Sequence, residues 1–426
     1  MDTPIRARDI RDAVASGRVS AVDICRAALD RISARNPPLN AFRAIAPERA
    51  LTRAAELDAR PDRATLPLLG VPVALKDNMC TRGIATTASS RILDGYMPPY
   101  DATVVERLEA AGALGSDTGG SIRQPAALCG VVGLMPTYGR VSRYGLIAFA
   151  SSLDRIGPLT RTAKDAAILL GQMAGRDPLD STSADVLVDN YIATIEQPVR
   201  GLRLGVPPEY FGEGLDAEVR TAVEAAIQAL AKAGCEVTPV SLPHTKYAIA
   251  TYYLVATAEA SSNLARYDGV RYGYRTPQAR TLAEMYRRSR EEGFGPEVKR
   301  RIMLGTYALS SGYYDAYYSK AQRVRTLMAN DFKEVFKQVD LIAAPTTPTP
   351  PFRFGEKTND PVAMYLSDVF TIPSNMAGNA SVSIPCGLSA KGLPLGFQLI
   401  ADQFADKILL SVARAYENAR PFPALP

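Results

Sequence analysis

The chain has 426 residues, of which 47% are hydrophobic and 22% are charged; these are ordinary values for a globular protein, so a large core is feasible. Its formal net charge of +5, from 49 Lys and Arg against 44 Asp and Glu, is too small to indicate nucleic-acid binding by charge alone. Five cysteines without a Cys-x-x-Cys pair, together with a single histidine, support neither a zinc site nor a disulfide framework.

The N-terminal residues and the lengths of the apolar runs indicate the cellular compartment, and the lack of linker-like segments indicates the number of domains. The first residues lack the apolar core of a signal peptide, and no stretch approaches ~20 consecutive apolar residues, so we expect a cytoplasmic protein without membrane association. No glycine-serine linker, low-complexity tract or charge block divides the chain. We therefore expect one domain over residues 1–426, beginning with a helical part over 1–60.

The first part of the chain predicts helices followed by strands. Apolar spacing predicts two short amphipathic helices within residues 4–34 and a third over 46–58 with Pro47 in its first turn. An apolar, β-prone run bounded by Gly70 and Pro72 predicts a buried strand that ends at Lys76. The elements expected next are a helix over 102–111, a strand over 114–117, and a helix over 163–174 capped by Thr162.

The second part alternates strands with helices. Residues 202–206, 217–233 and 234–240 are typical of a β-α-β unit, and residues 245–338 indicate a helical layer over one side of a pocket. A strand from Leu341, a strand pair over 381–385 and 395–400, and a last helix over 407–419 complete the fold. This alternation predicts an α/β protein with a mixed, mostly parallel central sheet covered by helices on both faces.

The stretch Gly115-Ser-Asp-Thr-Gly-Gly-Ser121 places a serine directly after two glycines. Glycines let backbone N–H groups approach a reacting atom closely, so such a loop can hold a nucleophilic oxygen beside donors for an oxyanion. A structural or phosphate-binding turn is the usual explanation for an isolated Gly-Gly-Ser. The other residues described below favour an acyl-transfer site.

A serine nucleophile needs a base, and the chain offers two kinds of candidate. The only histidine, His244, lies in a proline-punctuated loop where surface histidines are common, although a Ser-His-Asp triad stays open. Lys76 closes an apolar strand, with Asp77 and Asn78 beside it. Burial disfavours the charged form of lysine and lowers its pKa, which would make Lys76 a usable base.

These motifs resemble those of the amidase signature enzymes, which use a serine, a bridging serine and a lysine. The match runs from Gly115 to Thr162 almost without a break. The segments 297–306, 312–317, 373–381 and 384–387 resemble, within that family, the A subunits of bacterial glutamyl-tRNA(Gln) amidotransferases. The resemblance covers nearly the whole chain and implies the amidase signature fold.

The resemblance implies a role for each residue of the site. Ser121 would be the acylated nucleophile and Lys76 the base, while the backbone N–H groups of Thr118, Gly119, Gly120 and Ser121 would form the oxyanion hole. The implied substrate is glutamine, a zwitterion that requires a guanidinium at one end and a carboxylate at the other. The substrate-binding residues implied by alignment with the family are Arg301 for the α-carboxylate, Asp368 for the α-amino group and Tyr252 on the wall, with the adjacent Arg300 as the alternative to Arg301.

The resemblance also implies partners. A heterotrimer with two further subunits, B and C, would convert Glu-tRNA(Gln) to Gln-tRNA(Gln) with the ammonia released here. The tRNA would be handled mainly by the B subunit, and ATP and Mg would be bound in the partner, so this subunit itself would hold no cofactor or metal.

One family feature is missing between Asn78 and Gly115. Family members carry there a segment Gly-Gly-Ser-Ser-Gly-Gly-Ser that supplies the bridging serine, whereas here Lys76 and Ser121 are only 45 residues apart. We therefore expect one strand-helix portion of the sheet to be absent. The nearest spare hydroxyls by sequence are those of Ser116, Thr118, Ser89 and Ser90.

Two alternative functions follow from these observations. A free-standing amidase acting on a less polar amide would carry apolar groups where Arg301 and Asp368 are expected. A non-catalytic scaffold subunit is the alternative that the missing bridging serine suggests.

Overall fold

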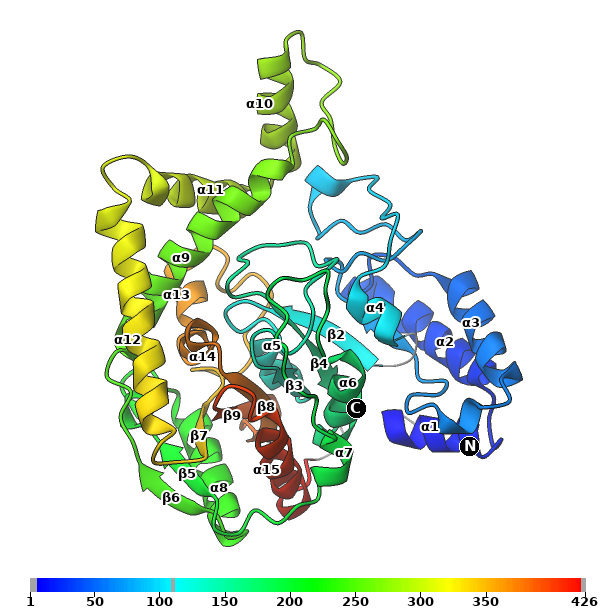
Figure 1. The fold of residues 1–426 in the computed structure, drawn as a ribbon, viewed down its shortest axis with the longest axis vertical. Coiled ribbons are helices and arrows are strands. Elements are labelled where there is room, and N and C mark those ends of the chain that lie inside the picture. Colours follow the sequence, from blue (N-terminus) through cyan, green and yellow to red (C-terminus); the bar gives the residue numbers. More distant parts are fainter. Residues whose placement is uncertain (1–5, 109–111, 423–426) are drawn as a thin grey trace.

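The computed structural model describes residues 6–108 and 112–422. A mixed sheet of nine strands in these residues runs through the molecule in the order β1-β2-β4-β3-β8-β9-β7-β5-β6 (Figure 1). The strands are β1 (Val73–Leu75), β2 (Gly112–Asp117), β3 (Val132–Met135), β4 (Arg155–Thr160), β5 (Arg203–Val206), β6 (Glu236–Pro239), β7 (Leu341–Pro345), β8 (Ala380–Leu388) and β9 (Pro394–Ala401).

The prediction of a mixed sheet is confirmed, but the prediction that it is mostly parallel is wrong. Parallel pairing joins β1 to β2 at one end and β7, β5 and β6 at the other. The five neighbour pairs between these ends are antiparallel. The inner strands β3, β4 and β8 are almost entirely buried on both faces, so their sequences predict a strand without indicating its direction.

Helices precede, connect and follow the strands. They are α1 (Ala7–Ala15), α2 (Ala21–Leu39), α3 (Pro47–Ala59), α4 (Thr103–Leu108), α5 (Arg123–Cys129), α6 (Ala163–Met173), α7 (Tyr191–Thr194), α8 (Ala217–Lys232), α9 (Ala248–Asn263), α10 (Leu282–Gly293), α11 (Pro296–Leu309), α12 (Lys320–Val335), α13 (Pro361–Leu366), α14 (Ile372–Ala377) and α15 (Asp406–Ala419).

Most predicted helices are found close to their expected bounds. Pro47 begins α3, and Thr162 caps α6 by accepting a hydrogen bond from the Asp165 N–H at 3.1 Å. The predicted helix over 102–111 corresponds to α4, and residues 109–111 lie outside the described residues. The second N-terminal helix, α2, is longer than expected, because it continues through Pro37 and Pro38 to Leu39.

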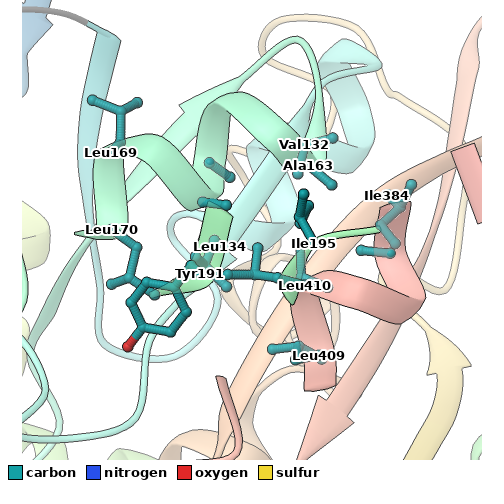
Figure 2. Packing of buried hydrophobic residues seen from close by; sticks show 14 of the residues in the cluster. Val132, Leu134, Ala163, Leu169, Leu170, Tyr191, Ile195, Ile384, Leu409 and Leu410 are labelled. Atoms are coloured by element: carbon teal, nitrogen blue, oxygen red, sulfur yellow. The ribbon is translucent and has the colours of Figure 1, made fainter. Parts of the chain in front are cut away.

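Helices cover both faces of the sheet, as β9 shows. Phe397 and Leu399 belong to a core cluster with residues of α6, α8 and α15, whereas Ile400 points the other way into a cluster with Phe332 of α12. Successive strand residues face opposite sides, so both faces are apolar and covered. Figure 2 shows part of the first cluster, where leucines of α6 and α15 meet β3.

The expected helical layer over 245–338 consists of α9, α10, α11, α12 and a π-helical turn, Asp315–Ser319. These helices lie on one side of the molecule, with α10 projecting at one end, while α1, α2 and α3 lie on the opposite side, beyond β2 (Figure 1). The described helices include none that is long and apolar enough to cross a membrane.

Candidate active site

Parallel pairing of β1 with β2 brings Lys76 to Ser116. Leu75 is in register with Leu114, so Lys76, which follows β1, lies beside the end of β2. The Lys76 Nζ is 3.0 Å from Ser116 Oγ and 3.3 Å from the Ser116 backbone oxygen. Asn78 Nδ2 donates to the same Oγ at 2.9 Å. Ser116 is only 5% exposed, so the hydroxyl is fixed between an amine and an amide.

Burial lowers the pKa of Lys76, and the carboxylates of Asp117 and Asp154 oppose that shift. The residue as a whole is exposed, and β1 is half-buried rather than buried as predicted. Lys76 lines a cavity beside β1, and its amine lies at hydrogen-bond distance from Ser116 at the end of β2. The amine therefore has the environment of a potential base although its side chain is not buried along its length.

Ser121 lies in a loop between β2 and α5 and is exposed. Its hydroxyl makes no hydrogen bond with any residue that the structure describes, and the same holds for its N–H and those of Gly119 and Gly120. Three neighbouring backbone donors are thus available at one loop, which is the requirement for an oxyanion hole. Within the described residues, the structure does not join Ser121 to Lys76 by a hydrogen bond.

Close contacts leave no room for a side chain at either of the two glycines before Ser121. A Cβ on Gly119 would lie 2.8 Å from the Tyr252 ring. A Cβ on Gly120, whose φ is +147°, would lie 2.4 Å from Thr371 Oγ1 and 3.2 Å from Asp368 Oδ1. The loop therefore passes directly against Tyr252 and Asp368, two of the predicted substrate-binding residues.

A buried ion pair closes this loop. Asp117, at the end of β2, and Arg123, at the start of α5, are both fully buried and 3.2 Å apart. Asp117 also accepts from the Ile122 N–H, while Arg123 donates to Thr371 O, Ser374 Oγ and Gln398 Oε1. Burial alone would raise the pKa of Asp117, but Arg123 and Asn375 lower it to about 2, so the carboxyl is ionised at neutral pH.

Asp154 fixes the other side of the loop. It accepts hydrogen bonds from Thr118 Oγ1 at 2.7 Å and from the N–H groups of Phe149 and Ala150. Burial raises its pKa to about 6, although these hydrogen bonds oppose the shift. Sequence reasoning missed Asp154; the signal that could have found it is its place in the segment from Gly115 to Thr162, which resembles the amidase signature enzymes.

Asp368 lies against Gly120 of the loop, and it interacts electrostatically with Arg301. Burial raises the pKa of Asp368 to about 7, with Asp117 adding to the shift and Arg123 and Arg301 opposing it. Gln124 Nε2 donates to Asp368 Oδ1 at 2.7 Å. Tyr252 is 5% exposed and interacts electrostatically with both Asp368 and Arg301.

The structure distinguishes Arg301 from Arg300. The Arg301 guanidinium lies within 6 Å of the rings of Phe149, Tyr253 and Tyr365, and its side chain is 24% exposed. The Arg300 side chain is 49% exposed. Both pair with Glu297, but only Arg301 is enclosed by aromatic residues and faces Tyr252.

The other candidate residues from the sequence, Ser89, Ser90 and His244, lie away from the Lys76 amine and the Ser121 loop. The Ser90 hydroxyl donates to Gly293 O. The Ser89 N–H donates to the Asp77 carboxylate, so this contact stabilises a turn and does not involve Lys76. His244 Nδ1 is 2.9 Å from Asp331 Oδ1 in a hollow of about 620 Å³ whose lining includes no residue of the Ser121 loop. Of the four spare hydroxyls, the structure therefore brings only Ser116 to Lys76, and it gives no support to a triad with His244.

The amidase family model matches residues 23–114 and 111–410. The chain belongs to the amidase family. This amidase is 54% identical over 465 aligned positions to the A subunit of glutamyl-tRNA(Gln) amidotransferase from Koribacter versatilis, covering 96% of this chain and 97% of the relative. The corresponding protein of Carboxydothermus hydrogenoformans is 51% identical, with 98% of each chain covered.

A solved structure of an amidase agrees with the fold. The crystal structure of the A subunit of glutamyl-tRNA(Gln) amidotransferase from Thermotoga maritima is 36% identical to this chain, with a TM-score of 0.78. The similarity covers 99% of this chain and 98% of the Thermotoga chain. The expected amidase signature fold is thereby confirmed.

The alignment lengths bear on the missing family segment. The alignment to the Koribacter relative has 465 positions and exceeds the 426 residues of this amidase by 39, so at least 39 positions of the relative have no counterpart here. The two stretches matched by the family model meet at residues 111–114. That these positions form one strand-helix portion of the sheet stays a prediction.

We predict that Asp117→Asn lowers the free energy of unfolding by about 3 to 5 kcal/mol, because Arg123 would remain buried without its counter-charge. Since the folded-state pKa of Asp117 lies below its unfolded value, its stabilising contribution is present above about pH 4 and is lost as the pH falls toward 2. Urea unfolding followed by circular dichroism measures both effects. Glu334→Gln, which removes an exposed pair with Lys337, is the control and should leave the midpoint unchanged; equal midpoints for the two variants would contradict the prediction.

Proposed function

We propose that this chain is the glutamine-hydrolysing subunit of a glutamyl-tRNA(Gln) amidotransferase. The observation that carries the proposal is that a carboxyl, Asp368, lies against Gly120 of the Ser121 loop and interacts electrostatically with a guanidinium, Arg301. A carboxyl and a guanidinium that interact beside a nucleophile loop suit a free amino acid better than an apolar amide. The names of the curated relatives support the same activity.

In the proposed reaction, the Ser121 oxygen attacks the side-chain carbonyl carbon of glutamine. The backbone N–H groups of Gly119, Gly120 and Ser121, with that of Thr118 at the loop entry, stabilise the resulting oxyanion. The proton of Ser121 passes to the Ser116 oxygen as the Ser116 proton passes to the neutral Lys76 amine. Lys76 then protonates the departing ammonia by way of Ser116. Water attacks the glutamyl ester and gives its proton to Lys76 along the same route, and that proton returns to the Ser121 oxygen as glutamate leaves.

The same proposal assigns a binding residue to each charged group of the glutamine substrate. Arg301 binds the α-carboxylate, because its guanidinium is held in the aromatic enclosure and already oriented by Glu297 at 2.8 Å. Asp368, oriented by Gln124, binds the α-amino group. Tyr252 forms the wall between them and stays protonated, since burial raises its pKa well above the ordinary value.

The proposed partners follow from the relatives' names, which describe the A subunit of an amidotransferase. We propose a heterotrimer with B and C subunits, in which ATP and Mg²⁺ are bound by the partner and Glu-tRNA(Gln) is held mainly by the B subunit. This chain would supply ammonia and hold no cofactor of its own.

We predict that Ser121→Ala and Lys76→Met each reduce ammonia release from glutamine by at least about a thousandfold, because each removes a group that acts on the reacting atoms. A coupled assay with glutamate dehydrogenase measures the ammonia. His244→Ala is the control and should retain full activity, since His244 pairs with Asp331 in a separate hollow. Equal rates for the native chain and Ser121→Ala would contradict the proposed function.

We predict that Ser116→Ala reduces kcat by about 10² to 10⁴-fold while the KM for glutamine changes little, because Ser116 contacts Lys76 and none of the proposed substrate-binding residues. Ser116→Thr keeps a hydroxyl and should recover a large part of kcat. Steady-state rates of ammonia release at varied glutamine concentration separate the two constants. A rise in KM without a fall in kcat would instead assign Ser116 a structural role.

We predict that the KM for glutamine rises by up to about tenfold for each unit that the pH falls below 7. The pKa of Asp368 is about 7, so its carboxyl is ionised and able to bind an ammonium group above that pH and is protonated below it. Initial rates of ammonia release between pH 5.5 and 8.5 measure the dependence. The dependence should be absent in Asp368→Asn, and a native chain with a flat KM over this range would exclude the role of Asp368.

A specific observation favours a second candidate, a non-catalytic scaffold subunit. Ser121 is exposed and makes no hydrogen bond to Lys76 or to any other described residue. Co-purification with two further subunits, together with no release of ammonia, would select this candidate over the glutaminase.

A further inference from the structure

Tyr365 of α13 contacts the residue that orients Arg301. Its hydroxyl donates to Glu297 Oε1 at 2.8 Å, and the same oxygen accepts from Arg301 Nε at 2.8 Å. Glu297 and Arg301 lie one turn apart on α11, whereas Tyr365 follows Glu297 by 68 positions in the chain. Two donors from separate elements therefore meet at one carboxylate oxygen.

The second donor is needed because the pair on α11 is weak by itself. The Glu297 side chain is 42% exposed, and an exposed pair of this kind leaves the carboxylate several rotamers. The Tyr365 hydroxyl favours the rotamer in which Oε1 faces Arg301. Burial alone would raise the pKa of Glu297, but the hydrogen bonds from Arg301 and Tyr365 lower it, so the carboxylate is charged at neutral pH and accepts from both donors.

The contact with Glu297 leaves the end of the Arg301 guanidinium open. Glu297 accepts from Nε, and within the described residues the two terminal nitrogens of Arg301 make no hydrogen bond. Two such nitrogens can bind one carboxylate in a planar, bidentate pair. The rings of Tyr253 and Tyr365, whose centroids are 4.0 Å apart, both lie within 6 Å of the guanidinium carbon. The guanidinium is thus held on its Nε side and beside two rings, with its terminal nitrogens available to a ligand.

The turn after Tyr365 carries Asp368. The Asp368 N–H donates to Tyr365 O at 3.1 Å, so the two residues belong to one hydrogen-bonded turn. Gln124 Nε2 donates to Ser367 O at 3.0 Å and to Asp368 Oδ1 at 2.7 Å. Ser367 is 4% exposed, and its Oγ accepts from Lys357 Nζ at 2.9 Å. The backbone that carries Tyr365 is therefore fixed together with Asp368.

We propose that Tyr365 is a positioning residue for the α-carboxylate of glutamine, on which it acts through Glu297 and Arg301. Its hydroxyl holds the guanidinium at a fixed distance from Asp368. The α-carboxylate and the α-amino group are attached to the same carbon atom, so both can be bound at once only if Arg301 and Asp368 keep that distance. The inference rests on the proposed binding of glutamine but not on its hydrolysis.

The experiment measures ligand binding by calorimetry in the full chain that carries Ser121→Ala, so that turnover does not affect the result. Adding Tyr365→Phe removes the hydroxyl and keeps the ring. This change should weaken the binding of glutamine by about tenfold, because a hydrogen bond to a charged group is lost. It should leave unchanged the binding of 4-aminobutanamide, which has the side-chain amide and the amine of glutamine but no α-carboxylate.

A matched control and a double-mutant cycle separate this role from general support of the fold. Tyr247→Phe removes a hydroxyl from a tyrosine that is 47% exposed, just before α9, and should bind both ligands as its parent does. Glu297→Ala should weaken glutamine binding, and adding Tyr365→Phe to it should cause no further loss, because the hydroxyl acts only through Glu297.

Four results would overturn the inference. They are additive losses in the cycle, an equal loss for both ligands, equal glutamine affinities of Tyr365→Phe and its parent, and no binding of glutamine by the parent. Ammonia release by the native chain tests the proposed function separately. Glutamine binding that depends on Tyr365, together with no ammonia release, would reject the glutaminase activity and support the inference.

Discussion

The chemistry of the site depends on one constraint, the parallel pairing of the three-residue strand β1 with β2. This pairing fixes the Lys76 amine against the Ser116 hydroxyl at 3.0 Å, in surroundings that lower the pKa of the amine. A lysine that remained in solvent would be fully charged at neutral pH and could not accept a proton. Because β1 pairs on one side only, the same strand that positions Lys76, the proposed base, also borders a large, mainly apolar cavity.

The loop of Ser121 depends on a second, deeper element, the buried pair of Asp117 and Arg123. Asp117 ends β2 and Arg123 begins α5, so their contact sets the path of the four residues between Asp117 and Ile122. The further bonds of Arg123 to Thr371 and Ser374 connect that loop to the segment that carries Asp368. The loop of Ser121 and the segment that carries the proposed substrate-binding residue Asp368 are thus held by the same guanidinium, and a change at one is expected to reach the other.

Much of the fold follows from the sequence, because local signals determine element type. Thr162 and Pro47 mark helix starts, and the apolar run before Lys76 marks β1. Strand direction is not predictable in this way, since the sequence of a strand buried on both faces does not show whether its neighbours run parallel or antiparallel to it.

The same distinction applies to the candidate site: local motifs indicate some of its residues, whereas its contacts depend on which distant segments meet. The glycines before Ser121 and the residues Arg301 and Asp368 are found by motif, whereas the contact of Lys76 with Ser116 requires the register of β1 on β2. Apart from Asp117, the partners named for Arg123 come from segments more than 200 positions away, so no local pattern indicates them. The cavity beside β1 likewise leaves no signal in any single segment, because its walls come from α2, α3, β1, β2, α4 and the loops between them.

The most direct test of the account is the titration of Lys76 in the intact chain. Lysine labelled with ¹³C at Cε can be followed by NMR across the pH range, with Lys76→Arg identifying the signal. The account predicts that Lys76 titrates below the ordinary lysine value, and that its titration moves in Ser116→Ala, which removes its hydroxyl partner. A Lys76 signal that titrates with the surface lysines, unchanged by Ser116→Ala, would contradict the assignment of this amine as the base.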